Sequence, residues 1–293
     1  MHYAVGFIGL GIMGEGMAKC LIEDSIAGTE ATPLILWNRT QSKCEAFKAK
    51  YPKRQIIIMD TARELVESCS IVYSMLSTPE VSKAVFEGED GVLAGVSDGK
   101  AIVDCATLGE EDMKKMSEAV VKAGGRFLEA PVSGSKVPAI TGTLIFLCAG
   151  DKALFDEVKD TGLKAMGKAS HFFSEEVGYG TRAKLVINSL MGTMVAAFGE
   201  GLALSESVGL DPIKMIEVIG QGAIQSPVYG LKGPKMVVKD HAPNFPLKHA
   251  HKDMALACEM AKEAGVEYSV MEKAEELFRG AREDDDLNVA DED

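Results

Sequence analysis

A glycine pattern close to the first residue constrains the fold most strongly. Gly9, Gly11 and Gly14 follow a short apolar run over residues 3–8, and apolar residues at helical spacing come after them. Such a run is typical of a strand that is buried on both faces. G-x-G-x-x-G between a strand and a helix predicts a turn that holds a dinucleotide pyrophosphate at the helix N-terminus.

Each glycine of this pattern has its own physical role. The first permits the tight turn out of the strand, the second lets the pyrophosphate approach the backbone, and the third lets the helix pack closely on the sheet. A glycine-rich tight turn without a ligand is the alternative. We therefore expect the cofactor to contact Gly9, Leu10, Gly11, Ile12, Met13 and Gly14.

The length and charge of the chain limit the class of protein. Its 293 residues suggest two domains, and its formal net charge is −13. A nucleic-acid partner would require a basic face, so we expect none. A small anionic substrate remains compatible, because a binding site needs only local positive charge.

The six cysteines stand singly in the sequence, without paired spacing. This distribution is typical of reduced thiols in a reducing compartment. The first expected strand begins almost at Met1, and no uninterrupted apolar run approaches the roughly 20 residues that a membrane helix needs. We therefore expect a cytoplasmic protein with no membrane partner.

The end of the second expected strand, residues 34–37, bears on the choice of cofactor. An acidic residue at this end would bind the ribose 2′-hydroxyl of NAD, whereas an arginine accommodates the 2′-phosphate of NADP. Here the chain continues with Asn38, Arg39 and Thr40, and Lys43 follows one helical turn later. A solvated turn is the alternative, but the pattern favours NADP.

Strands and helices continue to alternate after this point, which indicates a doubly wound α/β Rossmann sheet. Ligands of such sheets bind at the carboxyl ends of the strands, so Met75, Leu76 and Thr107 should line the cofactor crevice. Core packing of Met75 and Leu76, or a helix cap at Thr107, would also suit the sequence. We expect further strands over residues 55–59, 71–76, 101–104 and 126–130, and helices from about Thr61, from about Pro79 and over residues 114–123.

The composition of the sequence changes near residue 178. A proline-free run rich in Ala, Leu, Met and Val, from Thr181 to about Val208, predicts one long helix. Only helical patterns follow, over residues 212–221, 234–239, 249–264 and 269–282, before an acidic tail. We expect a Rossmann domain over 1–177, an interdomain helix over 178–208 and an all-helical domain over 209–293. The apolar long helix indicates a homodimer or homotetramer.

Two segments carry groups suited to chemistry on a small anion. Pro131 leads a turn in which Ser133 and Gly134 present a hydroxyl and backbone N–H groups to an anion, although an ordinary loop is the alternative. In the long helix, Lys184 and Asn188 lie on one face, whereas Arg182 points elsewhere and should be solvated. Burial of a lysine lowers its pKa, so Lys184 is a candidate proton donor; a snorkelling or salt-bridged lysine is the alternative.

Taken together, these motifs resemble the β-hydroxyacid dehydrogenase family, which includes 3-hydroxyisobutyrate dehydrogenases. The resemblance depends on four ordered motifs, and within the family the chain is most similar to glyoxylate/succinic semialdehyde reductases. The motifs are the glycine pattern from Gly9, Pro131-Val132-Ser133-Gly134, Gly180-x-x-x-Lys184-x-x-x-Asn188, and Lys252-Asp253.

The resemblance assigns a role to each of these residues in the NADPH-dependent reduction of a small aldehyde acid. Lys184 would protonate the carbonyl oxygen, and Asn188 would hold the substrate and the lysine in register. The substrate-binding residues would be Ser133, Gly134, Asn188, Thr107, Phe245 and Asp253, and Lys252 would reach the cofactor; Thr107 would contact the substrate or the nicotinamide ribose.

Several features depart from the family pattern or leave alternatives open. Glu129 stands where the family usually has Asp, and Ala106 replaces a common Ser, which bears on substrate preference. His249 and His251 could suggest a metal, but a surface helix turn suits them better, so we expect no metal. An NAD-dependent 3-hydroxyisobutyrate-type dehydrogenase is the alternative enzyme, and some relatives that have lost the lysine are non-catalytic scaffolds.

Overall fold

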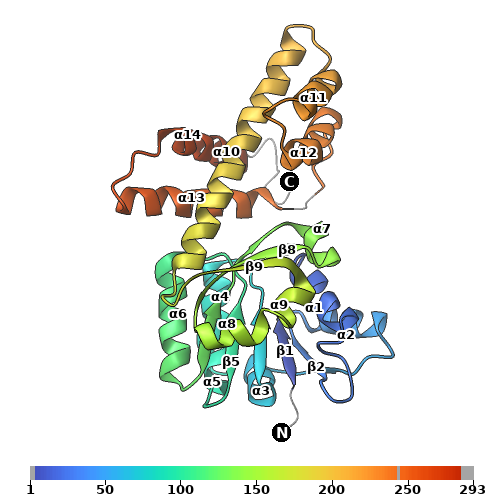
Figure 1. Cartoon of the computed structure of the whole chain (residues 1–293), viewed down its shortest axis with the longest axis vertical. Coiled ribbons are helices and arrows are strands. Elements are labelled where there is room, and N and C mark those ends of the chain that lie inside the picture. The colour runs from blue at the N-terminus through green and yellow to red at the C-terminus, as the bar shows by residue number, and fades with distance from the viewer. Residues whose placement is uncertain (1–3, 243–244, 285–293) are drawn as a thin grey trace. The chain divides into compact units, whose positions relative to one another are not determined.

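A computed structural model describes residues 4–242 and 245–284 of the chain (Figure 1). Tyr3 of the first expected strand and residues 285–293 of the expected tail lie outside the described residues. The chain divides into two compact units, Met1–Lys184 and Leu185–Asp293, and each is described by itself below. The division lies within the long helix, one turn beyond its first residue.

The first unit is built on a mostly parallel sheet, which confirms the expected fold class. In the described part of the chain the sheet has nine strands in the order β3-β2-β1-β4-β5-β6-β8-β7, and β9 also pairs with β8. The chain order reverses between β1 and β4, which are parallel neighbours. The strands are β1 (Val5–Ile8), β2 (Leu34–Trp37), β3 (Ile56–Ile58), β4 (Ile71–Ser74), β5 (Ala101–Asp104), β6 (Arg126–Glu129), β7 (Val132–Ser133), β8 (Leu144–Gly150) and β9 (Gly167–Ser174).

Helices cover both faces of this sheet. They are α1 (Gly14–Glu23), α2 (Gln41–Lys50), α3 (Ala62–Ser68), α4 (Pro79–Glu87), α5 (Val92–Gly95), α6 (Glu110–Lys122), α7 (Lys136–Thr141), α8 (Lys152–Val158) and α9 (Gly162–Met166). Side chains alternate along the strands, so Phe7 packs in one cluster with α1 and α9 while Ile8 packs in another with α3 and α6. Burial on both faces explains the near-continuous apolar runs.

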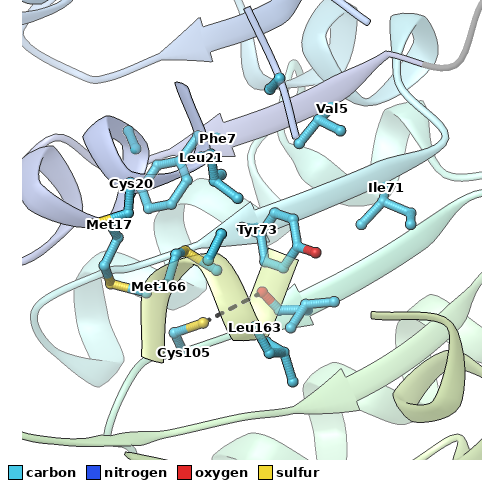
Figure 2. Packing of buried hydrophobic residues seen from close by; sticks show 14 of the residues in the cluster. Val5, Phe7, Met17, Cys20, Leu21, Ile71, Tyr73, Cys105, Leu163 and Met166 are labelled. Atoms are coloured by element: carbon cyan, nitrogen blue, oxygen red, sulfur yellow. Dashed lines mark hydrogen bonds between the residues drawn. The ribbon is translucent and has the colours of Figure 1, made fainter. Parts of the chain in front are cut away.

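Figure 2 shows the core cluster under α1 and α9, in which Phe7 and Leu21 lie close to Tyr73 and Leu163. Tyr73 points at the start of α9, where a Cβ added to Gly162 would lie 2.0 Å from the tyrosine hydroxyl oxygen. Only glycine therefore lets α9 sit on this strand. The close packing fixes β4, which ends at the predicted cofactor crevice.

The sequence patterns missed several elements of the first unit. No element was expected over residues 143–177, yet β8, β9, α8 and α9 lie there. The turn expected after Pro131 contains the short strand β7 and leads into the short helix α7, and neither element was expected. Strand β8 is the antiparallel partner of β6, so its place in the sheet depends on a pairing that no local signal specifies.

The helices of the second unit are α10 (Tyr179–Ser207), which begins in the first unit, α11 (Pro212–Gln221), α12 (Pro227–Val238), α13 (Leu247–Glu263) and α14 (Ser269–Glu283). The expected start of a helix at Pro234 was wrong, because α12 begins at Pro227 and contains Pro234. Ser226 caps α12 by accepting a hydrogen bond from the amide of Val228. Pro227 at the first helical position and the cap at Ser226 stabilise the start of α12. Pro234 has no amide hydrogen, so the helix lacks one internal hydrogen bond there.

Helix α10 combines great length with apolar composition. It is the one described helix whose length and hydropathy would allow a membrane span, and a third of its most apolar window is buried. A core helix of a soluble protein passes the same test, so this finding is weak evidence for a membrane. Phe198 of α10 stacks on Tyr229 of α12 with ring centroids 4.2 Å apart. This contact gives α10 a packing role within the second unit.

Candidate active site

The glycine turn after β1 has the geometry that dinucleotide binding requires. Gly9 has φ +96°, and a Cβ there would lie 2.4 Å from the carbonyl oxygen of Met75. A Cβ on Gly14 would lie 1.9 Å from the carbonyl oxygen of Gly9. Around Gly11, by contrast, no described atom lies within 4 Å of such a Cβ. The first and third glycines therefore serve the fold, and the second leaves open space for a ligand.

Asn38 connects this turn to the end of β2. Its Oδ1 accepts a hydrogen bond from the amide of Leu10 at 2.9 Å, and its Nδ2 donates to the carbonyl of Thr40 at 2.9 Å. The side chain thus fixes the two loops to each other. Two further predicted cofactor residues lie on the glycine turn: Ile12 is exposed and Met13 is half-buried.

Arg39, Thr40 and Lys43 are exposed at the end of β2, as a phosphate contact requires. Arg39 also lines a pocket of about 190 Å³ together with Trp37 and Val81. An exposed guanidinium beside a mostly apolar pocket suits a phosphorylated nucleoside.

The predicted residues of β4 and β5 reach the same edge of the sheet. Met75 donates its amide to the carbonyl of Ile8 at 2.9 Å, so β4 and β1 stay paired up to the glycine turn. Leu76 is buried and Thr107 half-buried, each just beyond the end of its strand. Gly109 rather than Thr107 caps α6, so the helix-cap alternative for Thr107 was wrong. The order reversal between β1 and β4 places the predicted crevice here.

Ser133 and Gly134 lie at the end of β7, directly before α7. Ser133 is half-buried and pairs with Ile145 of β8. Gly134 has φ +125°, and a Cβ there would lie 2.9 Å from the side chains of Leu144 and Pro138. Glycine is therefore required for the backbone to turn from the sheet into the short helix, and this residue is exposed.

Lys184 is buried in the second turn of α10, with 6% of its surface exposed. The first turn of the helix is held to the sheet by Glu129, which accepts hydrogen bonds from the amides of Gly178 and Gly180 at 2.6 and 2.9 Å. Glu129, whose departure from the family pattern was taken to bear on substrate preference, is therefore engaged with the backbone of this helix. The alternative of a snorkelling Lys184 does not fit a buried side chain.

Arg182, expected to be solvated, makes a two-point ion pair. Its Nε and Nη2 donate to the carboxylate of Glu110 at 2.7 and 2.6 Å, and this pairing raises the pKa of Arg182 and lowers that of Glu110. Lys114 adds a second contact to Glu110 at 2.7 Å. The expectation failed because α6, remote in sequence, supplies the carboxylate.

A second buried carboxyl lies one strand away from Glu129. Asp104 is fully buried on β5, next to Glu129 in register, and its Oδ1 accepts a hydrogen bond from Ser74 Oγ at 2.5 Å. Burial raises the pKa of Asp104 to about 7, and the nearby Glu129 adds to this effect. Because Glu129 accepts four hydrogen bonds, it stabilises negative charge better than Asp104, which therefore retains the proton more readily.

In the second unit, three predicted residues form one polar group, in which Asn188 and Asp253 are buried and Lys252 is half-buried. Asn188 of α10 donates from Nδ2 to Asp253 Oδ2 at 2.6 Å, and Lys252 Nζ lies 3.1 Å from the other carboxylate oxygen. Asp253 is 2% exposed and Asn188 4% exposed. Phe245, half-buried, lies just before α13. The structure thus groups Asn188, Lys252 and Asp253, whereas the glycine turn, Ser133, Gly134 and Lys184 belong to the first unit.

The surface turn expected for the histidines was wrong for His251. This residue is 8% exposed, its Nε2 lies 2.8 Å from Glu275 Oε1, and its Nδ1 lies 2.9 Å from Arg282 Nη1. Arginine can only donate, so Nδ1 accepts and Nε2 carries the proton toward Glu275. Among the described residues, no group of three or more His, Cys, Asp or Glu side chains could hold a metal ion.

Glu110, Asp104 and the backbone role of Glu129 were not predicted as parts of this region. The usable signal was an acidic residue at or next to the end of each of two expected strands, Asp104 and Glu129. Parallel strands end at one edge of a sheet, so two such acids predict a shared buried site there. No comparable signal marked Glu110, because its partner depends on helix packing.

Comparison with known protein families covers nearly the whole chain. Residues 4–179 match the family described as the NAD-binding domain of 6-phosphogluconate dehydrogenase. Residues 178–292 match the family described as NAD-binding of NADP-dependent 3-hydroxyisobutyrate dehydrogenase. The two matches meet at the start of α10.

Curated relatives show the same family. The chain is 43% identical over 282 residues to glyoxylate/succinic semialdehyde reductase 2, chloroplastic, of Arabidopsis thaliana, covering 95% of this chain and 75% of the relative. It is 39% identical to glyoxylate/succinic semialdehyde reductase 1 of the same plant, covering 95% and 92%. The human cytokine-like nuclear factor N-PAC is 32% identical, but the match spans 48% of its length and 95% of this chain.

Solved structures share the fold. A 3-hydroxyisobutyrate dehydrogenase from Salmonella typhimurium superposes with a TM-score of 0.87 at 23% identity, covering 99% of this chain and 97% of the other. Psf3, solved in complex with NADP+ and 2-OPP, gives a TM-score of 0.85 at 21% identity, with coverages of 99% and 96%. The chain therefore belongs to the 3-hydroxyisobutyrate dehydrogenase family of NAD(P)-dependent oxidoreductases, which act on CH–OH groups.

Proposed function

We propose that this protein is an NADPH-dependent reductase of small aldehyde acids such as glyoxylate and succinic semialdehyde. The observation that carries the proposal is the buried Lys184 on a helix whose first turn is fastened to the sheet. The substrates are those in the names of the two Arabidopsis relatives, which are 43% and 39% identical to the chain.

The chemistry needs one anion site and one proton donor. A bound nicotinamide cofactor supplies the hydride that is added to the carbonyl carbon. The ammonium of Lys184 gives its proton to the carbonyl oxygen, and solvent then restores that proton. Ser133 and Gly134 bind the substrate carboxylate through a hydroxyl and an amide. Asn188, fixed by Asp253, orients the substrate beside the lysine.

The choice of NADPH is supported by the end of β2. Exposed Arg39 and Lys43 offer positive charge, and the neutral Asn38 replaces the acid that would repel a 2′-phosphate. We expect Arg39→Ala to raise KM for NADPH about 10- to 100-fold, because a charge-assisted pair contributes about 1.5–3 kcal/mol. KM for NADH should change little. A strong preference of the native enzyme for NADH would favour the NAD-dependent 3-hydroxyisobutyrate-type alternative.

The decisive experiment is a panel of aldehyde acids with NADPH, measured on the native enzyme and on Lys184→Ala. Loss of a general acid should lower kcat about 10²- to 10⁴-fold. Lys122→Ala, at the exposed end of α6, is the matched control and should keep full activity. Full turnover by Lys184→Ala would refute the assigned acid, and absence of turnover with every aldehyde acid would favour a non-catalytic scaffold.

We further propose a homodimer or homotetramer in the cytoplasm. Assembly is supported by the apolar side chains that the second unit exposes, among them Leu204, Val218 and Ile224 at 64%, 58% and 68%. A reducing compartment is supported by the six cysteines, all in the described part of the chain, unpaired, and five of them buried. Light scattering and titration of free thiols in the purified protein test these two proposals.

A further inference from the structure

One buried carboxylate fastens the first turn of α10 to the sheet. Glu129 Oε1 accepts from the amides of Gly178 at 2.6 Å and Gly180 at 2.9 Å. Its Oε2 accepts from the amide of Thr181 at 3.2 Å and from the hydroxyl of Thr181 at 2.7 Å. Four donors from one short segment thus converge on a side chain that is 0% exposed.

A carboxylate in this place satisfies groups that would otherwise lack partners. The first amides of a helix have no acceptor within the helix, and its N-terminus favours negative charge. Glu129 ends β6, a strand fixed on one side by β5 and on the other by β8. The acceptor is therefore attached to the rigid sheet, and the donors belong to the helix.

The backbone around these donors leaves little room for another arrangement. Gly178 has φ +113°, a conformation that side chains other than glycine rarely adopt. A Cβ added to Gly180 would lie 2.3 Å from the carbonyl oxygen of Leu147 and 3.2 Å from Glu129 Cδ. The helix start is consequently pressed against β8 while Glu129 holds it from β6.

The position of Lys184 follows from this attachment. Thr181 and Gly180 precede Lys184 by three and four residues, so all three lie on one face of α10. A side-chain tip lies about 5–6 Å from a helix axis, so rotation of the turn by about 20° moves it about 2 Å. A misplacement of about 1 Å can cost about 10²-fold in rate.

We propose that Glu129 is a positioning residue for Lys184, which sets the rotation of the first turn of α10 and hence the place of the ammonium. The inference rests on the proposed function, in which Lys184 donates the proton. Glu129 accepts from residues 178–181 with both oxygens and acts on the reaction through the lysine alone.

A double-mutant cycle tests this assignment. Glu129→Gln replaces one acceptor oxygen by a donor that faces amide donors, so the first turn loses its fixed rotation. We expect kcat to fall about 10- to 100-fold while KM for NADPH stays within about twofold. In the Lys184→Ala background, Glu129→Gln should lower kcat no further, because the residue it positions is already absent.

Two further variants keep the test decisive. Thr181→Val removes only the hydroxyl donor and should reproduce a smaller kcat loss, again absent in the Lys184→Ala background; it replaces Glu129→Gln if that variant fails to fold. Glu129→Asp retains the charge and should recover part of the lost kcat. Arg182→Met removes the ion pair on the same turn, controls for general loosening, and should lower kcat less than Glu129→Gln.

The outcomes separate the inference from the proposed function. Equal kcat losses on adding Glu129→Gln to the native and the Lys184→Ala enzymes would overturn the positioning role and indicate a purely structural one. An unchanged kcat in a folded Glu129→Gln enzyme would overturn it as well. Undiminished turnover by Lys184→Ala would instead overturn the assigned proton donor.

Discussion

The two compact units differ in how completely they bury their apolar side chains. In the first unit, helices cover both faces of the sheet, and strand residues such as Phe7, Ile8 and Val103 are fully buried. In the second unit, none of the residues of α11, all of which are described, is buried. Leu204, which is 64% exposed, is one of several large apolar residues that the second unit presents to solvent.

This difference bears on how the protein assembles. The first unit buries two clusters of apolar side chains, one on each face of its sheet. Exposed apolar side chains on one unit mark a surface that another protein surface covers. In the proposed function, the first unit determines the geometry of the cofactor site and the proton donor, and the second is the part on which the proposed assembly depends.

The largest expected effect concerns assembly. Leu204→Asp combined with Val218→Asp places two charges at exposed apolar positions of the second unit, so the dissociation constant of the proposed oligomer should rise at least about 1,000-fold. Val121→Asp, a site 58% exposed in the first unit, is the matched control and should not alter assembly. Sedimentation velocity measures both. The comparison fails if the double variant keeps the native mass.

A pair of glycine substitutions in α10 compares the two units within a single helix. Gly180→Ala meets the fixed backbone carbonyl of Leu147 at 2.3 Å, and we expect it to cost about 3 kcal/mol of stability. Gly192→Ala meets the sulfur of Met254 at 2.4 Å, a flexible side chain that can move. Its net effect should stay within about 1 kcal/mol, since alanine also favours the helix. Urea denaturation measures the free energy of unfolding of both variants, and equal losses would contradict the expected difference in rigidity.

The pH dependence of stability tests the buried acid of the first unit. The pKa of Asp104 is raised to about 7 by burial. As pH rises from about 4 to 7, the unfolded chain loses this proton while the folded state keeps it, so stability falls across that window and then levels off. Between pH 5 and 8 the fall should reach about 2–3 kcal/mol. In Asp104→Asn this component should vanish, and an unchanged pH profile would show that Asp104 is not the responsible group.

The smallest expected effects concern helix caps. Thr61 forms a capping box with Glu64 at the start of α3, and Asp211 caps α11 through the amide of Ile213 at 2.9 Å. Thr61→Ala should cost about 1 kcal/mol of global stability. Asp211→Ala should mainly speed hydrogen exchange in the first turn of α11, because that helix buries no side chain. Equal losses of global stability in Thr61→Ala and Asp211→Ala would mean that α11 unfolds together with the core.

Local patterns were sufficient for much of the fold. The apolar runs predicted β1, β2, β4, β5 and β6, because strands buried on both faces must be apolar throughout. The missed strands β8 and β9 lie beyond β6 in the sheet. Strand β8 runs antiparallel to β6 and parallel to β9. The pairing of β8 with β6 joins residues that are far apart in the chain, so the periodicity of residues 143–177 alone does not predict it.

The site was predictable to the extent that its chemistry depends on local geometry. The glycine turn needs three glycines at fixed spacing, and the sequence predicted it. It could not predict that Asn38 would link two loops, that Arg182 would pair with Glu110, or that His251 would be buried. Each of these contacts joins residues that are far apart in the chain.

The kind of fold, the family and the position of the lysine in a helix could be predicted from the sequence, because each depends on spacing along the chain. What holds that lysine in place became clear from the folded structure. Glu129 lies 49 residues before Gly178, and the two meet because β6 ends where α10 begins. Hydrogen bonds of this kind depend on where the sheet and the helix lie in space, which no local pattern specifies.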